Sequence, residues 1–185
     1  TDNMKIGNTF AASNGNIVIK AVNGVNTAKG SNIANYAPDN IEITNTTGNG
    51  ISLAGRLANQ YGDIVLTNNG ADGIDVASSA NIINADGKLA MNNTGAGGID
   101  IMGKVTTQSK GTVIITNSDS NVTIGDNTSN NNYIDSDGKV TINIDNGNLL
   151  NFGVDKTLIN TNSGADLDIN VTNGAIGEEV GPCDG

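Results

Sequence analysis

The chain has 185 residues, with 19 acidic residues, nine basic residues and a net charge of −10. Nucleic-acid binding and attachment to an anionic membrane both need clustered Lys and Arg, so we expect neither from nine scattered basic residues. Histidine is absent and Cys183 is the only cysteine, which excludes His-dependent catalytic triads, His-bearing metal sites and an internal disulfide. No apolar run approaches the ~20 residues of a membrane-spanning helix, so we expect no membrane insertion.

The chain opens with a short alternating segment and then repeats one pattern. Residues 1–14 hold Met4 and Ile6 at alternating spacing, which predicts an N-terminal edge or an incomplete coil. Over residues 15–176 an apolar anchor is followed two residues later by a second apolar residue, and this spacing places both side chains on one face of a strand. The anchors recur at intervals of 24, 23, 25, 24, 27 and 27 residues, and the pairs are Ile17/Ile19, Ile41/Ile43, Ile64/Leu66, Leu89/Met91, Val113/Ile115, Val140/Ile142 and Leu167/Ile169.

Each repeat contains two further short apolar segments. The second strand of the repeat holds Ile51/Leu53, Ile74/Val76, Ile99/Ile101, Val122/Ile124 and, with a shifted register, Leu149/Leu150 and Phe152; the third holds Leu57, Ile82 or Ile83, and Val105. A unit this small cannot bury its apolar face alone, so it must stack on a neighbour. We therefore predict an all-β fold, a right-handed parallel β-helix (β-solenoid) of about seven coils of ~24 residues, with three short strands per coil.

An asparagine recurs four residues after the anchor in four consecutive repeats, at Asn45, Asn68, Asn93 and Asn117. Strand parity points these side chains inward at a corner, where stacked amides can form an Asn ladder along the axis. The alternative is that Asn is present because it tolerates a left-handed corner conformation.

Two polar insertions, 126–137 and 154–165, interrupt the repeat. Insertions in solenoids extend as loops from one face and often bind ligands, although many have no such role. If the chain contacts a ligand, the candidates are in the loops around Asn130–Tyr133 and Lys156–Ser163, namely Asn130, Asn131, Asn132, Tyr133, Lys156, Asn160 and Asn162. Residues 177–185 lose the pattern and predict a tail or a linker to a further module.

Clustered carboxylates are the only candidates in this sequence for catalysis or metal binding. Asp75 and Asp100 occupy equivalent positions one coil apart, which predicts a separation of roughly 5 Å on an outer face, similar to the pair of a retaining glycosidase. Few aromatic or basic residues are available to bind a sugar, so we predict no catalytic site and no enzyme. We also predict no cofactor and no metal site; calcium is the one open alternative, through a weak local match of residues 97–101 to a calcium-binding nonapeptide repeat.

The recurring phrase reads GDIVLTN…GIDV, GKLAMNN…GIDI and GTVIITN…NVTI. It resembles the shaft repeats of filamentous-haemagglutinin-like adhesins, the large exoproteins of two-partner secretion in Gram-negative bacteria; the shafts of classical autotransporters are similar. The resemblance covers residues 15–176 and implies a secreted protein on the bacterial cell surface, exported through an outer-membrane transporter partner. The secretion domain of that family carries an NPNG or NPNL motif, and this chain contains no Asn-Pro pair, so it does not match that domain.

These observations leave three functional hypotheses. The first is a rigid shaft in a surface adhesin, stacked on adjacent coils of a longer parent chain and supporting adhesion to a host-cell glycan or surface receptor. The second is a β-helical polysaccharide-active enzyme that uses outer-face acids such as Asp75 and Asp100. The third is an ice- or surface-binding solenoid, for which the row Thr44, Thr67, Asn92 and Thr116 supplies only part of the regular Thr face required.

Overall fold

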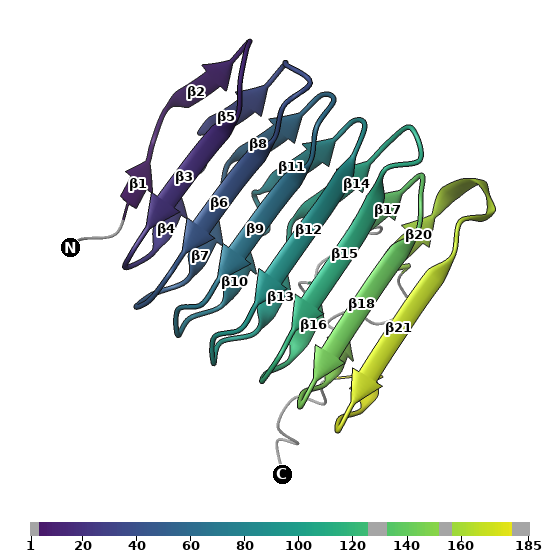
Figure 1. The fold of residues 1–185 in the computed structure, drawn as a ribbon. Coiled ribbons are helices and arrows are strands. Elements are labelled where there is room, and N and C mark those ends of the chain that lie inside the picture. The colour runs from purple at the N-terminus through teal and green to yellow at the C-terminus, as the bar shows by residue number, and fades with distance from the viewer. Residues whose placement is uncertain (1–3, 126–132, 152–156, 179–185) are drawn as a thin grey trace.

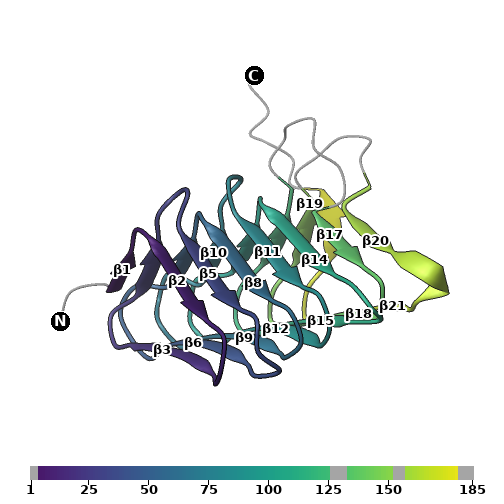
Figure 2. The same ribbon diagram turned by 90° about the horizontal axis from the view of Figure 1, so that it is seen from above.

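The computed structural model describes residues 4–125, 133–151 and 157–178. This part of the chain forms 22 short strands and one 3-10 turn, η1 (Asn162–Gly164), and contains no α-helix. The strands wind into three parallel sheets, because each coil contributes one strand to every sheet in turn (Figures 1 and 2). The fold is a parallel β-solenoid of about seven coils, which confirms the predicted fold class.

We refer to the three sheets as A, B and C in the order in which the chain enters them. Sheet A contains β1 (Met4–Ile6), β4 (Val25–Thr27), β7 (Ile51–Leu53), β10 (Ile74–Val76), β13 (Ile99–Ile101), β16 (Val122–Ile124), β19 (Leu149–Asn151) and β22 (Ile176–Glu178). Sheet B contains β2 (Thr9–Ala12), β5 (Asn32–Asn35), β8 (Arg56–Asn59), β11 (Asn81–Asn84), β14 (Lys104–Thr107), β17 (Ile134–Ser136) and β20 (Ile159–Thr161). Sheet C contains β3 (Ile17–Ala21), β6 (Ile41–Asn45), β9 (Ile64–Asn68), β12 (Lys88–Asn93), β15 (Thr112–Asn117), β18 (Val140–Asp145) and β21 (Leu167–Thr172).

Strand register follows the apolar anchors of the sequence. In sheet C, Ile17 lies opposite Ile41, Ile41 opposite Ile64, and Ile64 opposite Leu89, and the series continues to Leu167. A slip of one residue would turn every anchor to the solvent face, so burial of the anchors fixes the register.

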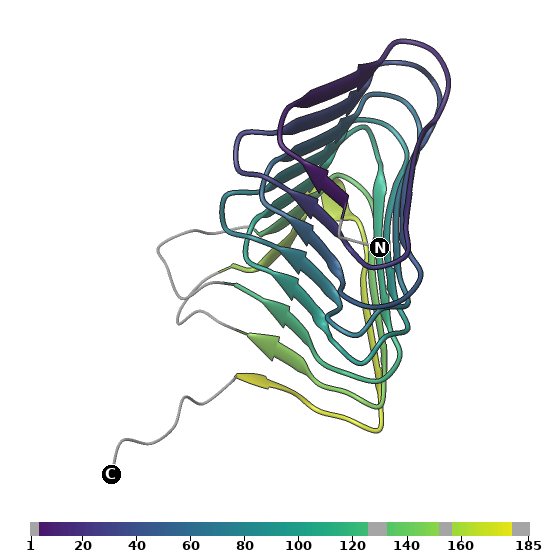
Figure 3. The same ribbon diagram turned by 90° about the vertical axis from the view of Figure 1, so that its left-hand side faces the viewer.

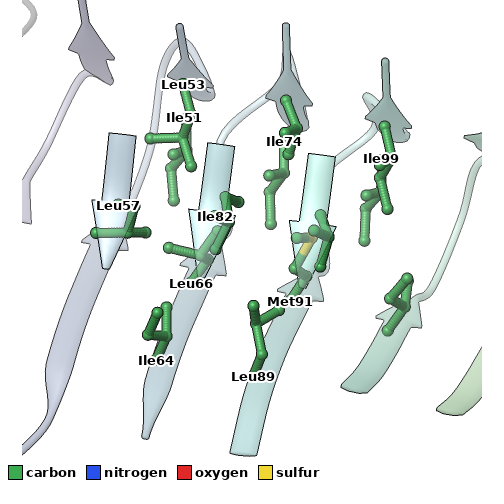
Figure 4. Close-up of a cluster of buried hydrophobic side chains, with 14 of the residues drawn as sticks. Ile51, Leu53, Leu57, Ile64, Leu66, Ile74, Ile82, Leu89, Met91 and Ile99 are labelled. Atoms are coloured by element: carbon green, nitrogen blue, oxygen red, sulfur yellow. The ribbon is translucent and has the colours of Figure 1, made fainter. Parts of the chain in front are cut away.

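The core consists of columns of apolar side chains that run along the axis. Alternate residues of every sheet point inward, and in the central coils these side chains are fully buried. Figure 4 shows the contributions of the three sheets meeting inside: Ile51, Leu53, Ile74 and Ile99 from sheet A, Leu57 and Ile82 from sheet B, and Ile64, Leu66, Leu89 and Met91 from sheet C. Seen from its N-terminal side, the solenoid consists of successive coils stacked one behind the other (Figure 3). Each fully buried aliphatic side chain contributes about 1.5–3 kcal/mol relative to an exposed one.

Glycines such as Gly50, Gly73 and Gly98 directly precede strands of sheet A and lie above one another in a column. A Cβ atom on Gly50 would overlap the carbonyl oxygen of Gly73, and one on Gly73 would overlap that of Gly98. Gly73 also has a φ of +79°, a conformation that side chains with a Cβ rarely adopt. Glycine therefore lets successive corners approach each other at the spacing that the sheets impose.

The structure corrects two sequence expectations. Ile134–Ser136 and Ile159–Thr161, which we assigned to the polar insertions, are strands β17 and β20 of sheet B and pair with each other. The predicted register shift in the sixth coil is also wrong, because Leu149 lies directly opposite Val122. Phe152 lies outside the described residues.

Both ends of the stack are built from the same repeat. Strands β1 and β2, within the predicted N-terminal edge, pair with β4 and β5. Strand β22 pairs with β19 and extends to residue 178, past the boundary at residue 176 that we assigned to the repeats. The rest of the predicted tail, including Cys183, lies outside the described residues.

Replacing a core-column side chain should destabilise the solenoid far more than replacing an outer-face side chain of the same sheet. Leu66 is fully buried, so Leu66→Ala should lower the free energy of unfolding by about 2–5 kcal/mol through lost burial and a cavity. Val18 lies on the outer face and is 48% exposed, so Val18→Ala should change it by less than about 0.5 kcal/mol. Urea denaturation followed by circular dichroism measures both, and equal losses would contradict the assignment of the core.

Candidate functional site

The predicted asparagines form a continuous amide ladder inside the corner between sheets C and A. The Asn45 side-chain amide donates to Asn68 Oδ1 at 2.7 Å, Asn68 donates to Asn93 at 2.8 Å, and Asn93 donates to Asn117 at 2.7 Å. All four side chains are almost completely buried. Each amide also donates to a carbonyl oxygen of its own turn, at Asn49, Gly70, Gly95, Gly97 or Ser120. The ladder therefore supplies hydrogen bonds to corner carbonyls that the sheets leave unpaired.

Left-handed corner geometry occurs at other asparagines. The four ladder residues end strands of sheet C and are not among the described residues with positive φ. In the next two coils, where Ile144 and Val171 replace the ladder residue, the corner instead contains Asn146 and Asn173, each with φ 56°. The alternative explanation for the four ladder residues, that Asn is present there because it tolerates a left-handed corner conformation, is therefore wrong.

A second polar column, which the sequence analysis missed, lines the corner between sheets B and C. It lies two residues after the inward apolar residue in five of the seven strands of sheet B, β5, β8, β11, β14 and β17. Its members, all buried, are Asn35, Asn59, Asn84, Thr107 and Ser136. Asn59 donates to the carbonyls of Asp39 and Asp63, both at 3.0 Å. The hydroxyls of Thr107 and Ser136 lie 2.7 Å apart. This column could have been found from its position, because its members all follow an inward apolar residue by two. It was missed because the residue type changes from Asn to Thr to Ser along the chain.

The outer face of sheet A carries the predicted carboxylates. Asp75 lies directly opposite Ser52 on one side and Asp100 on the other. The Ser52 hydroxyl donates to Asp75 Oδ2 at 3.1 Å, whereas Asp75 Oδ1 is buried without a hydrogen-bond partner. A shallow open groove of about 340 Å³ runs beside Asp75, lined by Asn26, Asn49, Gly50, Ile51, Ser52, Asp72, Gly73 and Asp75.

The environment of Asp75 opposes its ionisation. Partial burial raises the pKa of this carboxyl above its usual value, the Ser52 hydrogen bond partly counteracts that effect, and the charge of Asp100 raises the pKa further. A carboxyl of raised pKa beside a second carboxyl is the arrangement that general acid catalysis uses. The same features also arise in any half-buried acid on a stacked strand.

The predicted ligand-contact residues fall into three groups. Asn130, Asn131, Asn132 and Lys156 lie outside the described residues. Tyr133 is only 4% exposed and belongs to the core, so its side chain is not placed to contact a ligand. Asn160 and Asn162 are half-buried at the C-terminal end and donate to Asp135 Oδ1 at 2.9 and 3.0 Å. These two amides thus form part of a hydrogen-bonded cluster at the end of sheet B.

The predicted Thr row lies on the outer face of sheet C but is short. Thr44, Thr67, Asn92 and Thr116 are successive neighbours in register. Lys20 precedes this row and Asn143 follows it. The row is therefore bounded by a charge at one end and contains Asn within it, so it is not a regular Thr face.

Within residues 4–125, 133–151 and 157–178, no group of three or more acidic, Cys or His side chains is arranged to hold a metal ion. No helix in this part of the chain is long and apolar enough to cross a membrane. The sequence matches no protein-family model, and no match was found among curated proteins or solved structures.

Removing one ladder amide should destabilise the protein, because its partners remain buried. Asn93→Ala removes one of the two acceptors of the Asn68 amide and the ladder donor to Asn117 Oδ1, so we expect a loss of about 1–3 kcal/mol of unfolding free energy. Asn92→Ala is the matched control, because the neighbouring Asn92 points to the outer face of the same strand. If both variants unfold at the same urea concentration, the ladder contributes no stability.

The raised pKa of Asp75 makes the stability of the folded protein depend on pH, in a direction that follows from the sign of the shift. Between the usual carboxyl pKa and the raised one, the folded state binds more protons than the unfolded state, so stability falls as pH rises through that interval. Asp75→Asn should therefore raise the thermal midpoint at pH 7, and its advantage should disappear below about pH 3.8, where both states are protonated. Asp72→Asn, which removes one carboxylate from the same groove, is the control for the change in net charge in a series of melting curves. A destabilised Asp75→Asn at pH 7 would contradict the assignment.

Proposed function

We propose that this chain is a rigid shaft segment of a large secreted or surface-displayed bacterial adhesin, holding a binding site at a distance from the cell. The observation that supports it is the unbroken parallel pairing of successive coils through three sheets, from β1 to β22. Backbone hydrogen bonds between coils run along the axis, which makes such a structure stiff in the direction of pull. About seven coils at a strand spacing of ~4.8 Å give a rod of roughly 34 Å.

The repeat suits a shaft for three physical reasons. Each coil contacts only its neighbours, so length grows with the number of repeats without redesign of the core. The Asn ladder donates to turn carbonyls in four consecutive coils, which supports the same corner conformation from coil to coil. The net charge of −10 favours solubility and keeps shafts apart.

The proposed export and location depend on the resemblance of the recurring phrase to shaft repeats of two-partner-secretion adhesins. On this proposal the chain reaches the bacterial surface through an outer-membrane transporter partner. A host-cell glycan or surface receptor is then bound by the adhesin as a whole, and the shaft supplies reach. The shallow groove on sheet A, lined mainly by small and polar residues, lacks the aromatic anchors typical of a strong binding site.

A polysaccharide-active enzyme is the second candidate, and Asp75 is the observation that favours it. Its raised pKa and its neighbour Asp100 would suit a general acid and a nucleophile or base on the outer face. The groove beside Asp75 is open and polar, which suits an extended glycan. However, the lining contains no basic or aromatic side chain to bind a sugar ring, so the shaft is the better supported proposal.

A shaft should resist force and bind nothing itself. Pulled from its two ends in optical tweezers, the chain should keep the length of a rod of roughly 34 Å until coils unfold. On host cells and a glycan array it should show no saturable binding, with or without calcium. Saturable binding, or release of reducing ends that disappears in the Asp75→Asn/Asp100→Asn double variant, would contradict the spacer role and favour the second candidate.

A further inference from the structure

The three sheets present outer faces that differ in charge. On sheet A the outward residues include Asp75 and Asp100, and on sheet C they include Glu42. Strands β5, β8, β11 and β14 of sheet B lie side by side along one flank of the rod (Figure 2) and contain no acidic residue; their charged side chains are Arg56 and Lys104. We call the outward side chains of these four strands, with the one residue that follows each strand, the B face. In a protein of net charge −10, two copies can approach each other with least repulsion across the B face.

Strand register arranges the B face in three rows that run along the rod at the strand spacing of ~4.8 Å. The central row consists, in coil order, of Ala34, Ala58, Ile83 and Thr106. Ala34 and Ala58 point outward but are only 0% and 6% exposed, so they lie lower than the longer side chains of the rows beside them and form the floor of a shallow furrow. Ile83 and Thr106 are larger and half-buried, so they form a low ridge in the same row.

Two exposed tyrosines lie beside the furrow. Tyr36 belongs to the third row of the B face, and Tyr61 directly follows that row one coil further on; each is 52% exposed. The Gln60 side-chain amide donates to the Tyr61 hydroxyl oxygen at 3.0 Å, and the tyrosine O–H can still donate to another group. Exposed aromatic side chains are enriched in protein–protein contacts. The B face is therefore apolar at its centre, aromatic on one side and free of acidic residues.

We propose that two copies of this chain pack side by side through their B faces, with the rods antiparallel and a two-fold axis between β8 and β11. A second copy is the partner that the face fits, because it carries the same rows at the same strand spacing. The axis reverses the coil order, so Ala58 lies opposite Ile83 of the second copy, and Ala34 lies opposite its Thr106. The ridge of each copy therefore enters the furrow of the other. With the rods parallel, the central row would face itself, furrow against furrow and ridge against ridge.

The same axis gives the polar side chains suitable partners. Arg56 lies opposite Asn81 of the second copy, so the guanidinium group faces an amide and not another cation. Lys104 likewise faces an asparagine of the first row. Tyr61 lies opposite Asp86 of the second copy, whose exposed carboxylate can accept a hydrogen bond from the tyrosine hydroxyl.

The contact is small and joins one rod to another. Four strands, each about five residues wide, cover roughly 300 Å² per copy, against ~800 Å² for a stable complex, so we expect a dissociation constant on the order of 1 mM for the isolated chain. The contact needs no other target, so the expected absence of binding to host cells and glycans is unchanged. On the proposed shaft function, antiparallel rods extend from two facing surfaces; the pairing itself is tested without assuming that function.

Sedimentation equilibrium of the 185-residue chain at concentrations up to about 1 mM tests the pairing. We expect the average mass to rise from 18.7 kDa towards twice that value and no further, because a two-fold contact closes on itself. Association should strengthen at high salt, since salt screens the repulsion between two chains of net charge −10. A mass of 18.7 kDa at every concentration and salt condition would overturn the proposal and leave the shaft function unaffected.

Matched substitutions identify the surface. Ile83→Asp places a carboxylate in the furrow of the partner twice per dimer, so it should weaken association at least tenfold. Ile114→Asp makes the same change at a half-buried outward position of sheet C, and its effect should disappear at high salt. Tyr36→Ser, at an exposed position, should weaken association three- to tenfold without risk to the fold. Equal effects of Ile83→Asp and Ile114→Asp at high salt, in variants that circular dichroism shows to be folded, would exclude the B face.

Disulfide trapping tests the antiparallel arrangement. In a Cys183→Ser background, copies with Ala34→Cys mixed with copies with Thr106→Cys should form a mixed disulfide on oxidation. Ala34→Cys copies alone should not, because the axis places their thiols about three strand spacings, or ~14 Å, apart. Efficient disulfide formation by Ala34→Cys alone, without the mixed product, would show that the rods are parallel and overturn the proposed symmetry.

Discussion

Backbone hydrogen bonding between successive coils is the constraint on which the rest of this structure depends. A coil of about 24 residues has too little apolar surface to fold alone, so it must pair with its neighbours along all three sheets. Parallel pairing repeats at a single strand spacing, and equivalent residues of adjacent coils therefore lie directly above one another. For this reason the interior apolar side chains, the corner glycines and the corner amides all form columns along the axis. Each residue must therefore pack against, or hydrogen-bond with, the equivalent residue of the next coil.

The Asn ladder supplies hydrogen bonds at the corners that the apolar columns cannot supply. Where the chain turns between sheets, backbone carbonyls face the interior without a partner in the ladder of strands. Asn93 and its neighbours in the column fill this position with side chains that donate both along the axis and to the local turn. Asn45, the first of the series, has a buried Oδ1 without a partner, because Ala21 occupies the preceding position. The ladder is therefore favourable inside a run of coils and incomplete where the run begins.

The outer surface is less regular than the interior, and this difference bears on function. The inward anchor positions are apolar in every coil, whereas one outward column holds in turn Ser52, Asp75, Asp100 and Thr123. Such variation is expected of a solvated face. A shaft requires only the regular interior and a soluble exterior, while an enzyme would require the pair Asp75 and Asp100 to act together with sugar-binding groups that the groove lacks.

The sequence by itself determined the coil period, the inward positions and the parallel β-solenoid, because anchors such as Ile41 and Ile64 recur with strand parity. It also placed the four ladder asparagines at an inward corner. Only the tertiary structure decided that their amides bond in series, that a second column of mixed residue types fills the opposite corner, and that Tyr133 lies in the core rather than in a binding loop. The physical reason is that strand parity shows which residues are equivalent and which face of the strand they occupy, whereas hydrogen-bond partners and the course of each corner depend on how neighbouring coils pack on one another.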